Sequence, residues 1–177
     1  MKFYTMLFCA VVLFLTPRSF GQKKGSFSSS GNASKLTYDL SASFGTYNER
    51  SYNEITLGLN WFLADWFNWR NSAFSRFGTN IDTVNGLDSA ARFQGSLETD
   101  GGGFGIHGFI GPGVRLATQN YNAAFGEAGL IFKLGGIKIG GGIKSLYYFS
   151  DRKDSLGLTL PKNDNQVFII LSGSGSL

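Results

Sequence analysis

The sequence predicts an all-β protein, an antiparallel up-and-down transmembrane β-barrel of about eight strands that follows a cleaved signal peptide. Three observations predict it. Side chains alternate between apolar and polar from residue 34 onward, aromatic residues gather at both ends of the alternating segments, and residues 1–21 have the order of charge and hydropathy of an export signal.

The first 21 residues form the predicted signal peptide. A basic head that includes Lys2 precedes an apolar run over 3–15, Pro17 ends that run, and Gly21 is a small residue suited to cleavage. A membrane anchor is the alternative, but about 13 apolar residues fall short of the ~20 that a spanning helix needs. Cys9 is the only cysteine and leaves with this segment, so we expect no disulfide in the mature chain.

Residues 22–33 are rich in Ser, Gly and Lys and predict a flexible lead-in to a barrel over 34–177. The chain has 16 basic and 12 acidic residues, and loss of Lys2 and Arg18 with the signal leaves 14 bases. This near balance does not favour a nucleic-acid partner. Glycine, at 25 of 177 residues, is about twice its usual ~7% share, and these glycines lie within apolar stretches.

The first two alternating segments are regular. Over 36–45 the even positions carry Leu, Tyr, Leu, Ala and Phe, and over 54–61 the odd positions carry Ile, Leu, Leu and Trp. The intervening positions are polar or glycine, as expected for strands with one apolar face, because successive strand side chains point to opposite faces.

The middle of the chain is less regular. Aromatic and polar residues alternate over 66–77, and this alternation changes phase near Asn71, which predicts a β-bulge. Residues 78–89 contain Asp82, Asn85, Gly86 and Asp88 and predict a loop, with Asn-Gly as a turn rather than a calcium site. Alternation returns over 91–98, where Ala, Phe, Gly and Leu stand opposite Arg, Gln, Ser and Glu.

The last four segments cover 106–116, 127–134, 137–147 and 167–171. In the first three, Ile, Leu, Val, Ala or Phe recurs at every second or fourth position, while Arg, Lys, His, Glu or Gly occupies positions between them, and the last carries Val167, Ile169 and Leu171. We therefore expect about eight strands in all, an even number that brings both chain ends to the same side of the barrel.

The predicted connectors alternate in length. Tight turns at 63–65, 100–102 and 135–136 separate longer polar connectors at 47–52, 78–89, 118–122 and 150–165. Outer-membrane barrels have short periplasmic turns and longer extracellular loops. The pattern thus predicts periplasmic termini, and extracellular loops 78–89 and 150–165 as the places where a ligand would bind.

Two further features favour a membrane barrel over a soluble one, whose apolar stripe would face inward. The polar face is mostly Gly, Ser and Thr, which suits a narrow lumen, and the aromatic residues lie near strand ends, as girdles at two lipid–water interfaces would. The predicted girdle residues are Trp61, Trp66 and Trp69 at one end and Phe44, Tyr47, Tyr52, Tyr147, Tyr148 and Phe149 at the other.

In this architecture residues 34–177 resemble the small eight-stranded outer-membrane barrels of the OmpA transmembrane and OmpX type. The resemblance implies the outer membrane of a Gram-negative cell, contact with its lipid and lipopolysaccharide, and insertion by the barrel-assembly machinery. Such barrels usually end with an aromatic residue. This chain ends with Leu177, which keeps the parity of Val167, Ile169 and Leu171.

The parity of the strands sends ionic residues of both signs into the predicted lumen. They are Asp39, Glu54, Glu98 and Glu127 with Arg92, Arg115, Lys133, Lys138 and Lys144, together with Arg70 if the third strand keeps its phase. Buried charges must be paired. The sequence therefore predicts an ion-paired, largely plugged lumen and a structural, surface-display or adhesive role, with a porin-like narrow pore for small solutes or ions as the alternative.

A lipid-active enzyme is a third hypothesis, and it would depend on His107, the only histidine. A catalytic serine needs a base, but the sequence around His107 offers no hydroxyl neighbour. One histidine and no mature cysteine also disfavour a transition-metal site. We therefore expect no enzyme activity, no cofactor and no metal.

Overall fold

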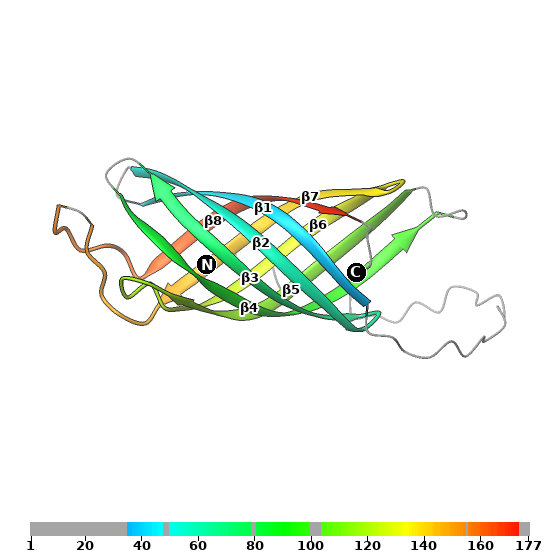
Figure 1. The fold of residues 1–177 in the computed structure, drawn as a ribbon, viewed down its shortest axis with the longest axis horizontal. Helices are drawn as coiled ribbons and strands as arrows, with labels where there is room; N and C mark the ends of the chain where they lie inside the picture. Colours follow the sequence, from blue (N-terminus) through cyan, green and yellow to red (C-terminus); the bar gives the residue numbers. More distant parts are fainter. Residues whose placement is uncertain (1–34, 48–49, 79–80, 100–103, 155, 174–177) are drawn as a thin grey trace, which may run out of the picture. The chain divides into compact units, whose positions relative to one another are not determined.

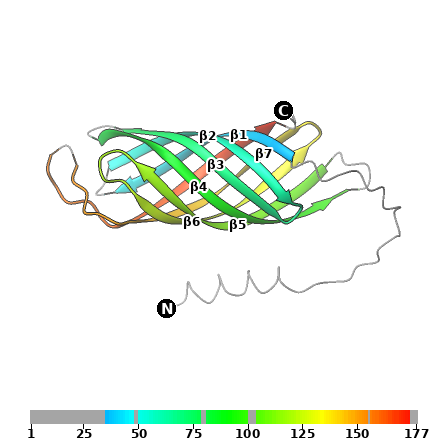
Figure 2. The same cartoon turned by 60° about the horizontal axis from the view of Figure 1, so that its bottom comes forward.

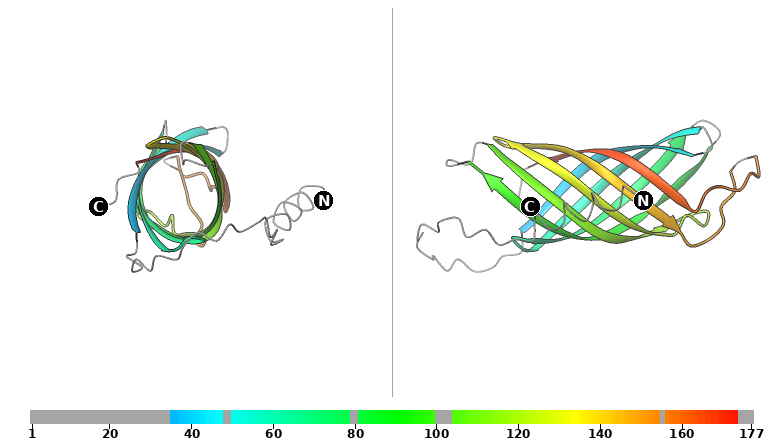
Figure 3. Two further views of the ribbon diagram at one scale, coloured as in Figure 1. Left: turned by 90° about the vertical axis from the view of Figure 1, so that its right-hand side faces the viewer. Right: turned by 180° about the vertical axis from the view of Figure 1, so that it is seen from behind.

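The computed structural model describes residues 35–47, 50–78, 81–99, 104–154 and 156–173. They form one closed barrel of eight antiparallel strands, each paired with its sequence neighbours, and β1 closes the ring against β8 (Figures 1 and 3). The strands are β1 Lys35–Tyr47, β2 Arg50–Ala64, β3 Phe67–Gly78, β4 Ile81–Glu98, β5 Phe104–Ala117, β6 Ala123–Leu134, β7 Ile137–Tyr148 and β8 Asn163–Gly173. The predicted all-β, up-and-down barrel is confirmed. None of the described residues belongs to a helix long and apolar enough to cross a membrane.

The predicted lead-in and signal peptide, and residues 174–177 at the C-terminus, lie outside the described residues. Lys35 and Gly173 lie at the barrel end that carries the turns 65–66 and 135–136, which we call the tight-turn end. The opposite end carries the connectors 118–122 and 149–162, and we call it the long-loop end (Figure 2).

Alternation along each strand separates two faces. On β2 every even position from Tyr52 to Asn60 is buried and every odd one is exposed, so that Thr56 is 1% exposed and its neighbour Leu57 is 59% exposed. The same division holds around the ring, with large apolar side chains outward and mostly polar ones inward. A soluble barrel has the opposite arrangement, with its apolar stripe inward.

The predicted phase change in the third strand is wrong. β3 alternates without interruption, with Arg70, Phe74 and Arg76 inward, and its register against β2 is continuous from Asn68 to Gly78. The register shifts lie instead near the strand ends, between Phe62 and Ala64 of β2 and between Arg76 and Gly78 of β3 where it pairs with β4. The sequence is misleading because this strand puts polar Asn71 outward and aromatic Phe74 inward.

The predicted loop over 78–89 is also wrong. β4 begins at Ile81 and is 18 residues long, so only 79–80 connect it to β3. Its Asp, Asn and Gly residues suggested a turn, but Asp88 points into the barrel and is paired there. β2 likewise begins at Arg50, within the predicted 47–52 loop. The predicted alternation of short and long connectors therefore does not hold, because 118–122 is no longer than 99–103 at the other end, and 149–162 is the one long connector between strands.

Two of the predicted girdle residues point inward. Tyr52 and Tyr148 are 1% and 0% exposed and belong to a hydrophobic cluster inside the long-loop end. Both residues occupy positions of their strands that face inward. The prediction had instead placed them by how near they are to a connector. Gly45 lies beside the Tyr52 ring, and any Cβ there would collide with it.

The other described residues of the predicted girdles are exposed. Trp61, Trp66, Trp69, Phe44, Tyr147 and Phe149 are between 41% and 61% exposed. Around the first tight turn they pack on one another, with the Trp61 and Trp69 ring centroids 5.4 Å apart. The Tyr47 side chain lies outside the described part of the structure.

Candidate functional site

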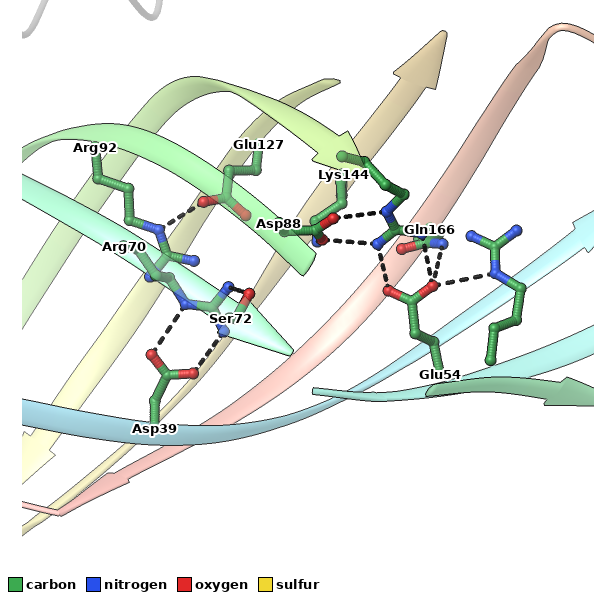
Figure 4. A network of polar contacts seen from close by, with 11 residues as sticks. Asp39, Glu54, Arg70, Ser72, Asp88, Arg92, Glu127, Lys144 and Gln166 are labelled. Carbon is green, nitrogen blue, oxygen red and sulfur yellow. Dashed lines mark hydrogen bonds and ion pairs between the residues drawn. The ribbon is translucent and has the colours of Figure 1, made fainter. Parts of the chain in front are cut away.

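The barrel interior holds a network of buried charges, which we call the inner network. The described strand residues contribute five buried acids and five buried bases to it, so the interior is balanced in sign. The acids are Asp39, Glu54, Asp88, Glu127 and Asp164, and the bases are Arg70, Arg76, Arg92, Arg115 and Lys144. All eight strands supply at least one member. Figure 4 shows side chains of the network pointing toward one another from the barrel wall, and it labels Asp39, Glu54, Arg70, Asp88, Arg92, Glu127 and Lys144.

Arg115 is the centre of one half of the network. From β5 it reaches across the barrel to Glu54 on β2, with Nη2 2.7 Å from Oε1 and Nη1 2.8 Å from Oε2. It also donates to both carboxylate oxygens of Asp88, each at 2.7 Å. Lys144 on β7 completes this group, with Nζ 2.9 Å from Asp88 Oδ2. Asp88 and Arg115 lie on neighbouring strands, but the Arg115–Glu54 and Lys144–Asp88 bonds join strands that are not neighbours, so side chains span the interior at this level.

Arg76 extends this half toward the long-loop end. Its Nε donates to Glu54 Oε2 and its Nη1 to Asp164 Oδ2, both at 3.1 Å. The same Asp164 oxygen accepts hydrogen bonds from the hydroxyls of Tyr52, at 2.5 Å, and Tyr148, at 3.2 Å. One carboxylate thus neutralises a guanidinium and satisfies two buried phenols.

The second half of the network centres on Asp39. Arg70 pairs with it through two bonds, Nη2 to Oδ1 at 2.6 Å and Nε to Oδ2 at 3.0 Å. Asn60 Nδ2 donates to Asp39 Oδ2 at 2.6 Å. A Cβ at Gly58 would lie 2.7 Å from both the Arg70 guanidinium and the Asp39 carboxylate, so glycine leaves the space that this pair occupies.

Arg92 and Glu127 form a simpler pair beside the Asp39 group, with Nε 2.6 Å from Oε1 (Figure 4). Among the described residues Glu127 is the one carboxylate within ion-pair distance of Arg92. The Arg92 Cζ also lies 4.2 Å from the centroid of the Phe109 ring. A cation over an aromatic face is attracted by the ring quadrupole.

Aromatic faces cover most of the other inner cations as well. Arg115 lies 3.7 Å above Phe74, and Lys144 lies 4.8 Å above Phe125. These rings lower the local dielectric, which strengthens each ion pair but raises the cost of leaving a charge without its partner. The interior is thus suited to holding fixed charges in pairs.

Three predicted lumen residues lie apart from the inner network. Glu98, Lys133 and Lys138 are at the tight-turn end, where the Glu98 side chain is 38% exposed and accepts a 3.0 Å bond from Lys133 Nζ. His107 Nε2 lies 3.3 Å from the same carboxylate. These residues have the inward parity, but they are at the strand ends, where water reaches them.

The prediction missed three charged members of the inner network, Arg76, Asp88 and Asp164, and the buried Gln166. Asp164 and Gln166 alternate with Val167 and Ile169 on β8, and extending that alternation toward the N-terminal end of the strand would have found them. Arg76 was obscured by the assumed phase change, and Asp88 by the assumed loop. Tyr52, placed at the surface, is in fact a hydrogen-bond partner of the network.

No family model matches the sequence, and no curated protein matches it. Among the described residues, no group of three or more His, Cys, Asp or Glu side chains is arranged to hold a metal ion.

Proposed function

We propose that this protein is an integral barrel of a Gram-negative outer membrane, whose lumen is closed by the inner network and whose role is structural or lies in what its long loop displays. The observation that carries the proposal is the outward apolar surface. Leu57, Leu97, Ile143 and Val167, on four different strands, are between 58% and 79% exposed. A continuous apolar band on the outside of a closed barrel is suited to lipid and costly in water.

The strands are long enough for this environment. They have 11 to 18 residues, whereas strands of globular proteins usually have about 5 or 6. Tilted strands of 9–11 residues already span a bilayer. The outward Trp side chains near the tight-turn end suit a lipid–water interface.

A closed lumen is favoured over a narrow pore because the inner charges are balanced and bonded across the barrel. Arg115 joins β5 to β2, and Lys144 joins β7 to β4, at distances of 2.7 to 2.9 Å. An ion would have to break these bonds to pass. We therefore propose an anchor and display scaffold, with the outer-membrane lipid, lipopolysaccharide and assembly machinery as its partners.

Catalysis is not part of the proposed role. His107 lies beside Glu98 in a partly exposed cluster with Lys133, and no described hydroxyl donates to its Nε2. A lipid-active function would predict altered lipid A in a deletion strain that His107→Ala fails to restore. We expect lipid A to be unchanged in both strains.

Two experiments test the proposal. Cell fractionation should recover the protein in the outer membrane, and the unboiled protein should migrate differently from the boiled one on a gel, as folded barrels do. The purified barrel in planar bilayers should give no steady conductance. Recovery in the soluble fraction would reject the membrane assignment, and stable ion-selective channels would replace the closed lumen with a pore.

A further inference from the structure

The connector between β7 and β8 folds back into the barrel mouth. Its described residues, 149–154 and 156–162, are here called the mouth segment. Leu160 is 3% exposed and belongs to the same hydrophobic cluster as Tyr121, Ala123 and Tyr148, which point into the barrel. Arg152 is 2% exposed, with its Cζ 3.2 Å from the Tyr148 ring centroid and 4.7 Å from that of Tyr121.

The mouth segment is held in place by one buried carboxylate. Asp154 Oδ2 accepts a 2.5 Å bond from Arg50 Nη1 at the start of β2, and the Asp154 side chain is 1% exposed. Its other oxygen accepts from the backbone N–H groups of Leu156, at 2.9 Å, and Leu158, at 2.8 Å. Asp154 thus shapes the tip of the segment and ties it to the start of β2.

Arg152 is only partly satisfied by its contacts in the mouth segment. It donates to the Pro161 carbonyl, but its Nε and Nη1 are buried without a protein partner, and no described carboxylate is within ion-pair distance. The Tyr148 and Tyr121 rings offset part of the cost of removing this guanidinium from water. An arrangement with the segment lifted would return Arg152 to water, which lowers the free-energy cost of opening.

We propose that the mouth segment is a cap that opens and closes the long-loop end of the barrel, with the Asp154–Arg50 ion pair as its latch and Arg152 and Leu160 as the groups that enter and leave the mouth. The cap controls access to the aromatic and charged lining around Tyr121 and Arg76. It works above the inner network, so it opens the mouth without opening a path through the barrel.

Thiol labelling tests the cap in the full chain, with Cys9 replaced by Ser so that one engineered thiol is present. Ala123→Cys places a reporter in the cluster that Leu160 covers, where the native residue is 0% exposed. In Asp154→Asn one amide oxygen replaces two carboxylate oxygens, so an NH2 group faces either the Arg50 guanidinium or the N–H groups of Leu156 and Leu158, and the charged latch is lost. A water-soluble thiol reagent should then label Ala123→Cys about ten-fold faster, which corresponds to about 1.4 kcal/mol between the closed and open states.

Two controls separate cap opening from other changes. Asp151→Asn removes an exposed acid of the same segment, whose partner Lys162 is also exposed, and should leave the labelling rate unchanged. Thr56→Cys is a reporter below the mouth, in a position 1% exposed, and should stay unreactive in the Asp154→Asn background. Gel mobility of unboiled samples verifies that each barrel is folded.

Each outcome is decisive. Equal Ala123→Cys rates with and without Asp154→Asn, or fast labelling with the latch intact, would overturn the cap. Labelling of Thr56→Cys in the otherwise unchanged barrel would instead overturn the closed lumen of the proposed function. Arg50→Gln removes the other partner of the latch and should reproduce the effect of Asp154→Asn.

Discussion

Glu127→Ala is the most informative perturbation of the inner network. Arg92 is 3% exposed and has its one described ion pair with Glu127, so the substitution leaves a guanidinium buried without a counter-charge. Breaking a buried pair in this way costs about 3 to 5 kcal/mol. Glu54→Ala is the contrasting case, because Arg115 keeps Asp88 and Arg76 keeps Asp164. We expect its cost to be smaller, although Glu54 has more bonds.

A paired replacement separates the stranded charge from lost packing. Arg92→Met with Glu127→Leu removes both charges and keeps apolar volume, and such exchanges are often neutral or stabilising by about 1 to 4 kcal/mol. The free energy of unfolding is measured by urea titration of the barrel in lipid vesicles, followed by tryptophan fluorescence and gel mobility. If Glu127→Ala costs under about 1 kcal/mol, water solvates Arg92 and the interior behaves as a pore. If the double variant is as costly as Glu127→Ala, the cost comes from lost packing and not from a stranded charge.

Three further predictions concern the faces, the packing and the cap. Leu57→Arg should cost about 2 to 4 kcal/mol in lipid if it is near the midplane, whereas Thr56→Ala on the inner face should be nearly silent, so equal unfolding free energies would reject the assigned faces. Gly58→Ala should destabilise by about 1 to 3 kcal/mol, because its Cβ would lie 2.7 Å from an ion pair; Gly126→Ala, which meets nothing within 4 Å, is its control. Burial of Asp154 opposes ionisation, but hydrogen bonds from two backbone N–H groups and a guanidinium hold the pKa of its carboxyl below the ordinary 3.8. The contacts of Asp154 should therefore persist above pH 3.8 and be lost as the pH falls through the lowered pKa of the folded protein. Their loss would be seen as faster hydrogen exchange of the Leu156 and Leu158 amides.

The strand parity was predictable wherever one face is uniformly apolar. On β2 and β7 the alternation assigns Glu54, Lys144 and their neighbours to the inside, and the structure agrees. This works because a strand has a side-chain period of two, so a few apolar positions fix the face of every other residue. The closed eight-stranded order follows from the same pattern and from the short connectors.

The exceptions arise where composition and parity disagree. Asp88 is in a stretch rich in Asp, Asn and Gly that reads as a turn, yet Arg115 and Lys144 neutralise it inside the barrel. Tyr52 and Tyr148 are amphipathic and near strand ends, which suits a girdle, yet their parity puts both inside, where their hydroxyls bind Asp164. Partners contributed by other strands make these placements stable, and a single-strand pattern cannot reveal such partners.

The arrangement of charges gives the network a second role, in fixing strand register. A slip of one residue would turn every inner side chain of a strand to the outer face of the barrel. On β6 it would move Glu127 outward and leave Arg92 alone in the interior, two costs from one displacement. A nonpolar pair at these positions would still fill the space, but it would penalise the slip less, because Leu is tolerated on either face. The Arg92→Met/Glu127→Leu barrel should therefore match the parent in stability yet fold with a larger fraction of misregistered or slowly refolding molecules, and an unchanged refolding yield would show that the register depends on the other pairs.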